Sequence, residues 1–279
     1  MLRPRNVAFV SSLLLVACAE RFDVESGVED GDTVAQDATN GTTGSPADDT
    51  DLTTGTASEG TSSTAADTEQ SGCEVREYGR FDGTAHLQID GFAHVPVTFE
   101  AWVLLKQPHP DDGTEHVAVC QRGTTNDGWG VRIGSESLTM SAFSKFDHPA
   151  QVEMATGTWR HVAWVYDGES SRVFVDGRVV DERVQSGGIE ETEARLVIGG
   201  CMSTSDVLHP SRGAIDEVRL SSTARYLSDF EPQDRFEDDE NTLVLLHMDG
   251  EAKDSSSHGH VVADFGVIWE TDEGDGTCR

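Results

Sequence analysis

Apolar and polar positions alternate through the last two hundred residues of the chain. Apolar or bulky side chains occupy every second position in four stretches, residues 85–89, 97–103, 117–119 and 161–165. Because successive side chains of a β-strand point to opposite faces, this period of two predicts strands with one face in a core. Three further strands are expected at 195–199, 214–220 and 242–247. The helical period is nearly absent, and we expect only one short helical turn, at 224–229.

The sharpest local signal is a hairpin at residues 173–180. Two β-branched runs flank Asp176-Gly177, a pair that tolerates the positive φ angles of a type I′ turn. Polar and Gly-rich turns separate the other predicted strands at intervals typical of sandwiches. The sequence therefore predicts an all-β fold, an antiparallel two-sheet sandwich.

The amino-terminal residues have the pattern of an export signal. Arg3 and Arg5 precede residues 7–17, which contain no charge and are too few to span a bilayer as a permanent helix. The run ends in Leu-Val-Ala-Cys at residues 15–18, which resembles the lipobox of bacterial lipoproteins. The resemblance implies that residues 1–17 are a lipoprotein signal peptide and that Cys18 is lipidated. An ordinary secretory signal is the alternative.

An acidic segment follows the proposed lipidation site. Of residues 19–72, 24 are Ser, Thr or Gly, 13 are acidic and only Arg21 is basic. Such a composition buries too little apolar surface to offset the entropy of ordering, so residues 18–72 are predicted to be the lipidated Cys and a disordered linker. The whole chain has 51 acidic and 20 basic residues, a formal charge of −31, which argues against nucleic acid as a partner.

The predicted strands resemble those of a known family. The matching segments, in chain order, are Phe81-Asp82-Gly83, residues 97–103, Gly157-Thr158-Trp159, the hairpin at 173–180, residues 196–200 and residues 213–220. They resemble the laminin G-like family of the concanavalin A-like lectin/glucanase superfamily. The resemblance implies that residues 73–279 form a laminin G-like jelly roll. Residues 242–260 resemble a segment often found at the start of such domains, which implies a permuted arrangement.

Four cysteines remain once Cys18 is set aside. Cys73, Cys120, Cys201 and Cys278 are an even number in an exported chain, which allows three disulfide pairings. We favour Cys73–Cys278, which would clamp the ends of the domain, with Cys120–Cys201 inside the sandwich. Free thiols are the alternative.

The family resemblance raises the question of calcium. Many laminin G-like domains hold calcium at an edge of the sandwich through Asp carboxylates and backbone carbonyls. By resemblance the candidate ligands are Asp216, Asp254 and, more weakly, Asp82. The loop after Asp254 departs from the family pattern, with Ser257 and His258 where Gly and Asn are usual. The sequence therefore leaves two equal alternatives, a structural Ca²⁺ ion or no bound metal.

The same superfamily contains glycoside hydrolases, which use paired carboxylates. The spacing Glu-x-Asp-x-x-Glu is absent, and Glu191 and Glu193, on one face of a polar turn, are expected to be solvated. Trp129, in a Gly-rich connection, could stack on a sugar or pack at a strand edge. We therefore expect no catalytic residue, and no ligand-binding residue is assigned.

Anchor, linker and fold together predict a function at the cell envelope. We expect a non-catalytic lipoprotein of the bacterial outer membrane or cell surface, lipid-anchored, which recognises a glycan or an envelope or extracellular protein. A glycan-active hydrolase with an unrecognised carboxylate pair and a structural surface protein without a specific ligand are the alternatives.

Overall fold

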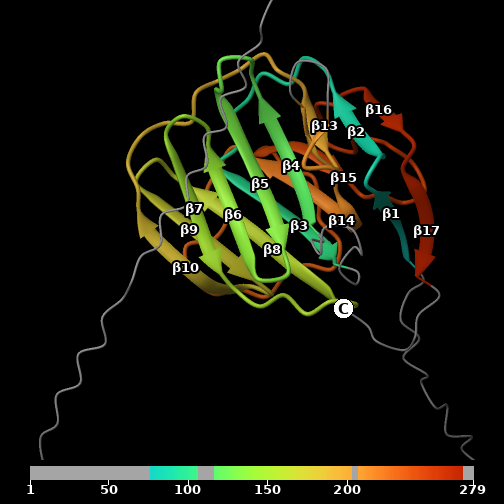
Figure 1. Cartoon of the computed structure of the whole chain (residues 1–279), viewed down its shortest axis with the longest axis horizontal. Helices are drawn as coiled ribbons and strands as arrows, with labels where there is room; N and C mark the ends of the chain where they lie inside the picture. The colour runs from blue at the N-terminus through green and yellow to red at the C-terminus, as the bar shows by residue number, and fades with distance from the viewer. Residues whose placement is uncertain (1–75, 106–115, 203–206, 273–279) are drawn as a thin grey trace, which may run out of the picture. The chain divides into compact units, whose positions relative to one another are not determined.

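Two antiparallel β-sheets face each other across an apolar core (Figure 1). The computed structural model describes residues 76–105, 116–202 and 207–272, all within a unit that spans Asp67–Arg279. Every regular element in these ranges is a strand. The predicted helical turn at 224–229 is wrong, because these residues follow an irregular path that packs against a sheet. The predicted all-β sandwich is confirmed.

Within the described residues, eight strands form sheet A and seven form sheet B. Sheet A contains β1 (Arg76–Asp82), β3 (Thr98–Leu104), β8 (Trp159–Tyr166), β9 (Ser170–Val175), β10 (Arg178–Val184), β14 (Arg212–Ser221), β15 (Thr242–Leu246) and β17 (Ile268–Asp272). Sheet B contains β2 (His86–Ile89), β4 (His116–Arg122), β5 (Gly128–Gly134), β6 (Ser137–Ala142), β7 (Phe146–Gln151), β11 (Leu196–Ile198) and β16 (Val262–Phe265). A small hairpin joins β12 (Cys201–Met202) to β13 (Val207–Leu208).

The hairpin predicted at 173–180 is formed by β9 and β10. Val175 pairs with Arg178 across a two-residue turn, in which Asp176 has φ 47° and Gly177 has φ 71°. Two positive φ angles in succession are the requirement of a type I′ turn. A side chain at Gly177 would clash with the carbonyl oxygen of Phe230, so glycine also admits a close backbone approach.

The core lies between the two sheets and takes the inward positions of each strand. Phe99, Ala101 and Val103 of β3 face Trp129, Val131 and Ile133 of β5 within one buried cluster. Trp129 is fully buried at the centre of sheet B, its indole nitrogen 3.3 Å from Oε1 of Gln121. The packing interpretation of Trp129 is therefore confirmed, although in a central strand rather than at a strand edge.

A second buried layer covers the outer face of sheet A. Residues 222–241, here called the covering segment, place Tyr226 and Phe230 against Phe174 of β9, and Phe236 against Trp102 of β3. The indole nitrogen of Trp102 also donates to the carbonyl of Gln233 at 3.0 Å. Trp102 is thus buried outside the main core.

The last strands of the chain return to the first. β17 pairs with β1, and β16 pairs with β2, so the carboxyl-terminal segment extends both sheets beside the amino-terminal strands. β15 pairs with β14 on the same side as β1, where β14 is irregular between Asp216 and Arg219. The predicted signal peptide, the predicted linker, Cys18, Cys73 and Cys278 lie outside the described residues. Within those described, we find no helix with the length and apolarity needed to cross a membrane.

Candidate functional site

The outer face of sheet B is hollowed over β4, β5 and β6. One hollow of about 260 Å³, here called the basic hollow, lies over the outward positions of these strands. Its described lining includes Arg122, Arg132, Phe143, His209 and the disulfide between Cys120 and Cys201. The covering segment packs on the outer face of sheet A, whereas the basic hollow leaves the outer positions of β4, β5 and β6 open.

Strand register places the lining side chains in rows across the sheet. Ala118, Arg132 and Thr139 are cross-strand partners in one row, and Cys120, Gly130 and Ser141 are partners in the next. Intervening residues such as Val131 point inward to the core, as alternation requires. The floor of the hollow is therefore made of small residues, with arginine side chains beside it.

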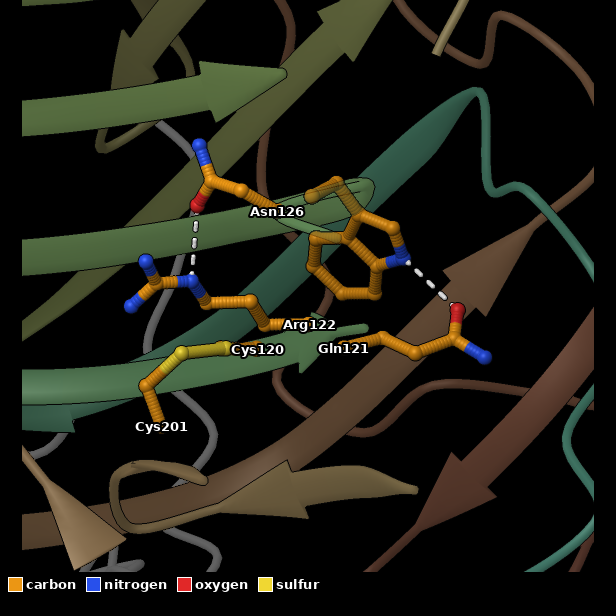
Figure 2. The surroundings of a disulfide bond; sticks show 6 residues. Cys120, Gln121, Arg122, Asn126 and Cys201 are labelled. Atoms are coloured by element: carbon orange, nitrogen blue, oxygen red, sulfur yellow. Dashed lines mark hydrogen bonds between the residues drawn. A yellow bond between two sulfur atoms is a disulfide. The ribbon is translucent and has the colours of Figure 1, made fainter. Parts of the chain in front are cut away.

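A glycine lets an aromatic ring lie close against the sheet. A Cβ added to Gly130 would lie 2.8 Å from Cζ of Phe143, so the ring occupies the space above this glycine. The guanidinium carbon of Arg122 lies 5.3 Å from the centroid of the Phe143 ring, within cation–π range. Nε of Arg122 donates to Oδ1 of Asn126 at 2.8 Å, which fixes the guanidinium (Figure 2).

The predicted Cys120–Cys201 disulfide is present, with the two Cα atoms 5.1 Å apart. Its expected place inside the sandwich is wrong. Cys120 takes an outward position of β4, as Arg122 does, whereas Gln121 between them extends the other way (Figure 2). The disulfide therefore ties β12 to the outer face of sheet B, and the chain after β13 brings His209 to the basic hollow.

Positive charge gathers in the basic hollow of an acidic domain. Residues 73–279 contain 38 acidic and 17 basic residues, yet no Asp or Glu occurs in the described lining. Arg132 is exposed and forms no ion pair with the part of the chain that the structure describes. Burial lowers the pKa of His209, and repulsion from Arg132 and Arg122 lowers that pKa further. Asp147 borders the hollow on β7, where it accepts the Ser141 hydroxyl at 2.6 Å.

A second hollow of about 650 Å³ adjoins the first at Arg122, which lines both. We call it the threonine hollow, because Thr124, Thr125 and Thr192 line it together with Asp127, Glu193, Arg195 and Met202. Hydrogen bonds from the Thr125 and Thr192 hydroxyls lower the pKa of Asp127. The threonine hollow thus presents hydroxyls and charges of both signs, which suit a polar ligand.

Comparison with known families agrees with this architecture. A laminin G-type model, described as concanavalin A-like lectin/glucanases superfamily, matches residues 81–229, slightly more than half of the chain. The chain belongs to this superfamily. The concanavalin A-like match ends before β15, so the segment read above as permuted lies beyond it. Comparison with curated proteins finds no match.

Several solved structures resemble this concanavalin A-like domain at low identity. A Bacteroides ovatus protein, provisionally described as carbohydrate binding, is 17% identical over 71% of this chain and 60% of that chain, with a TM-score of 0.49. Domains LG4–5 of the mouse laminin α1 chain are 15% identical over 57% and 46%, with a TM-score of 0.40. The CBM40 of Ruminococcus gnavus IT-sialidase, bound to α2,3 sialyllactose, is 13% identical over 56% and 95%, with a TM-score of 0.45. These likenesses are too distant to assign a ligand.

The three calcium candidates of this concanavalin A-like chain lie in three separate places. Asp254 is buried, and its carboxylate accepts four hydrogen bonds from Leu245, Ser256 and His260 at 2.9–3.0 Å. It also lies 2.7 Å from Nδ1 of His260. Burial raises the pKa of Asp254, but the backbone N–H donors outweigh it and the net pKa is lowered. Asp254 therefore closes a turn with its own chain.

Asp82 and Asp216 are engaged in the same way. Oδ1 of Asp82 accepts the hydroxyl and backbone N–H of Thr84 at 2.7 and 3.0 Å, and Oδ1 of Asp216 accepts the N–H of Glu217 at 2.9 Å. Asp216 and Glu217 line a hollow of about 440 Å³, in which Arg235 contacts Glu217 at 3.5 Å. Among the described residues, no group of three or more His, Cys, Asp or Glu could hold a metal ion. These carboxylates do not fit a calcium cage, and bound calcium stays a prediction.

Glu191 and Glu193 are exposed in the connection before β11, as expected of a solvated turn. The residues of the basic hollow were not found from the sequence. They come from β4, β5, the end of β6 and the chain after β13, so no local motif unites them. The alternation around Arg132, between Val131 and Ile133, is the one local signal that marks an outward arginine.

Proposed function

We propose that this chain recognises a glycan on the outer face of sheet B, without catalysis. One observation supports this most. Residues 222–241 cover much of the outer face of sheet A, and the hollow left at Asp216 and Glu217 is lined by charged residues and Thr271. The outer face of sheet B instead carries the basic hollow, which adjoins the threonine hollow at the β4–β5 turn. Binding sites are concave and combine apolar surface with a few convergent polar groups, which is the composition of these hollows.

The side chains suit a sugar in particular. Phe143 offers a ring on which the apolar face of a sugar can stack, and the Arg122 guanidinium holds that ring in place. Hydroxyls of Thr139, Ser141 and the threonine hollow, with the arginines, supply donors and acceptors around it. A sugar presents the same alternation of apolar faces and hydroxyl edges.

The proposal also includes the cellular location of the domain. We infer that Cys18 is lipidated and that residues 19–72 hold the domain away from the outer membrane or cell surface, because the export signal ends at a lipobox-like cysteine. Recognition of an envelope or extracellular protein on the same face is the alternative partner.

The test uses the full chain with Cys18→Ala, which removes the proposed lipidation site. We expect binding on a broad glycan array, and a dissociation constant about three- to tenfold higher for Phe143→Ala, the range of one aromatic contact. Phe265→Ala is the matched control, since Phe265 is half exposed on the edge strand β16, and it should bind as the parent does. Release of reducing ends from any bound polysaccharide would refute the absence of catalysis. An array without binding would refute glycan recognition.

A further inference from the structure

The charge of the basic hollow opposes that of the domain around it. With 38 acidic and 17 basic residues in 73–279, an uncommitted arginine has many carboxylates available as partners. Most arginines of sheet A take one, such as Arg172 with Glu182 at 2.8 Å and Arg219 with Glu100 at 2.8 Å. Arg132 takes none among the described residues, and Arg122 contacts an amide and a ring instead of a carboxylate.

The two arginines lie at opposite ends of the floor of the hollow. Arg132 pairs in register with Ala118, and Arg122 lies four residues further along β4, about 13 Å at strand spacing. Between them the outward positions are Cys120, which is joined to Cys201, and Gly130, over which the Phe143 ring lies. Both guanidinium groups line one hollow of about 260 Å³, with His209 beside them.

The other lining groups narrow the class of ligand. Burial lowers the pKa of His209, and the positive charges of Arg132 and Arg122 lower it further, so both arginines act on the same part of the hollow. Long polyanions such as nucleic acid would meet the repulsion of the whole domain, whereas a single acidic group would meet only the local field. Phe143, Thr139 and Ser141 supply contacts for the rest of a sugar ring.

We propose that the basic hollow binds the acidic group of an anionic sugar between Arg122 and Arg132, with the ring of that sugar over Phe143. This inference rests on the proposed glycan recognition and deepens it. The acidic group is a carboxylate or a sulfate, because the planar guanidinium fork matches both in two-point hydrogen bonding.

Matched pairs of probes test the inference by calorimetry on the full chain with Cys18→Ala. The pairs are trigalacturonate and its methyl ester, sialyllactose and lactose, and lactose sulfate and lactose. At least one acidic probe should bind tenfold or more tighter than its uncharged counterpart, the effect of one charge-assisted hydrogen bond. Raising the salt concentration should weaken the binding of that acidic probe and leave the affinity for the uncharged probe unchanged.

Three arginine variants locate the effect. Arg132→Gln and Arg122→Gln should each weaken the acidic probe about tenfold and leave the uncharged probe unchanged. Arg178→Gln is the control with the same loss of charge, since Arg178 is exposed on the edge strand β10 of sheet A. Arg178→Gln should change the affinity for neither the acidic nor the uncharged probe.

The outcomes separate this inference from the proposed function. If uncharged sugars bind as tightly as their acidic counterparts, the anionic class is wrong while glycan recognition stands. If Arg178→Gln weakens the acidic probe as much as Arg132→Gln does, the effect is one of overall charge and the hollow is not the site. If no sugar on the array or in the pairs binds, both proposals fail. Preference for carboxylate over sulfate, or the reverse, supports the inference and identifies the acid.

Discussion

Replacing Glu100 with Gln should test what holds the covering segment onto sheet A. The Glu100 side chain is 0% exposed on β3 and lies at the centre of a buried polar network. Its carboxylate accepts from Nε of Arg219 at 2.8 Å and from the Tyr226 hydroxyl at 2.8 Å, and lies 3.3 Å from Nε2 of His161. Tyr226 belongs to the covering segment, so the network joins that segment to β3, β8 and β14.

The expected loss of unfolding free energy is large because the charge of Arg219 would stay buried without its partner. The side chain of Arg219 is only 4% exposed, and removing one partner of a buried ion pair costs about 3–5 kcal/mol. Because Gln keeps the shape of Glu and one acceptor oxygen, we expect the free energy of unfolding to fall by about 3 kcal/mol. At about 2–4 °C per kcal/mol for a domain of this size, the melting temperature should fall by about 6–12 °C.

The stability difference between the parent and Glu100→Gln should change with pH in a defined direction. Burial raises the pKa of Glu100, but the hydrogen bond with His161 and the charge of Arg219 outweigh it, so the net pKa lies below its usual 4.5. A carboxylate with a lowered folded pKa contributes stability that is complete above the unfolded pKa and is lost as the pH falls through the folded one. The stability difference between parent and Glu100→Gln should therefore be constant at neutral pH and shrink in acid.

Urea titration of the full chain with Cys18→Ala measures the effect. Glu182→Gln is the control, because Glu182 pairs with Arg172 at the surface, where such pairs contribute about 0–1 kcal/mol. A loss below about 1 kcal/mol for Glu100→Gln, or one equal to that of the control, would show that the buried network does not hold the covering segment.

The remaining predictions concern the ends of the chain and the floor of the basic hollow. Gly130→Ala should leave the free energy of unfolding within about 1 kcal/mol of the parent, because the new methyl meets the far end of the Phe143 ring most closely and Cβ of Cys120 at 3.3 Å, yet it should weaken glycan binding by displacing that ring; an unchanged affinity would count against the stacking role. Intact-mass analysis should show four hydrogens gained on reduction, two for the disulfide of the basic hollow and two for Cys73–Cys278; a gain of two would leave the second pair as thiols. Chelation by EDTA should not shift the melting temperature, since the candidate carboxylates are engaged by the chain; a fall of several degrees would restore structural calcium. Labelling with a fatty-acid probe in a bacterial host should be abolished by Cys18→Ala, and persistent label would refute the lipobox.

The strands were predictable because alternation reports burial directly. Residues 97–103 and 214–220 were placed within two residues of β3 and β14, and Asp176-Gly177 fixed its hairpin, because the turn chemistry is local. The covering segment could not be foreseen, since its irregular path is set by contacts with Phe174 and Trp102 far away in sequence.

The site was less accessible from the sequence than the fold. The Cys120–Cys201 pair is what remains once Cys73 is paired with Cys278. The face of sheet B on which this disulfide lies depends on the direction of the Cys120 side chain. Because Val117 and Val119 point into the core, strand alternation already directs Cys120 outward. The family resemblance makes Asp254 and Asp82 candidate calcium ligands, whereas such carboxylates also close turns by accepting backbone N–H groups. Sequence alone does not distinguish the two uses.

The pairing of β1 with both β14 and β17 has a mechanical consequence. β1 begins at Arg76, four residues beyond the acidic segment, and is flanked on both sides, with four residue pairs to β14 and five to β17. Under the proposed anchoring, a pull between membrane and bound ligand enters the domain along this strand. Force directed along a strand loads its hydrogen bonds in shear, all at once, instead of peeling them one by one, so the attachment point resists tearing under flow.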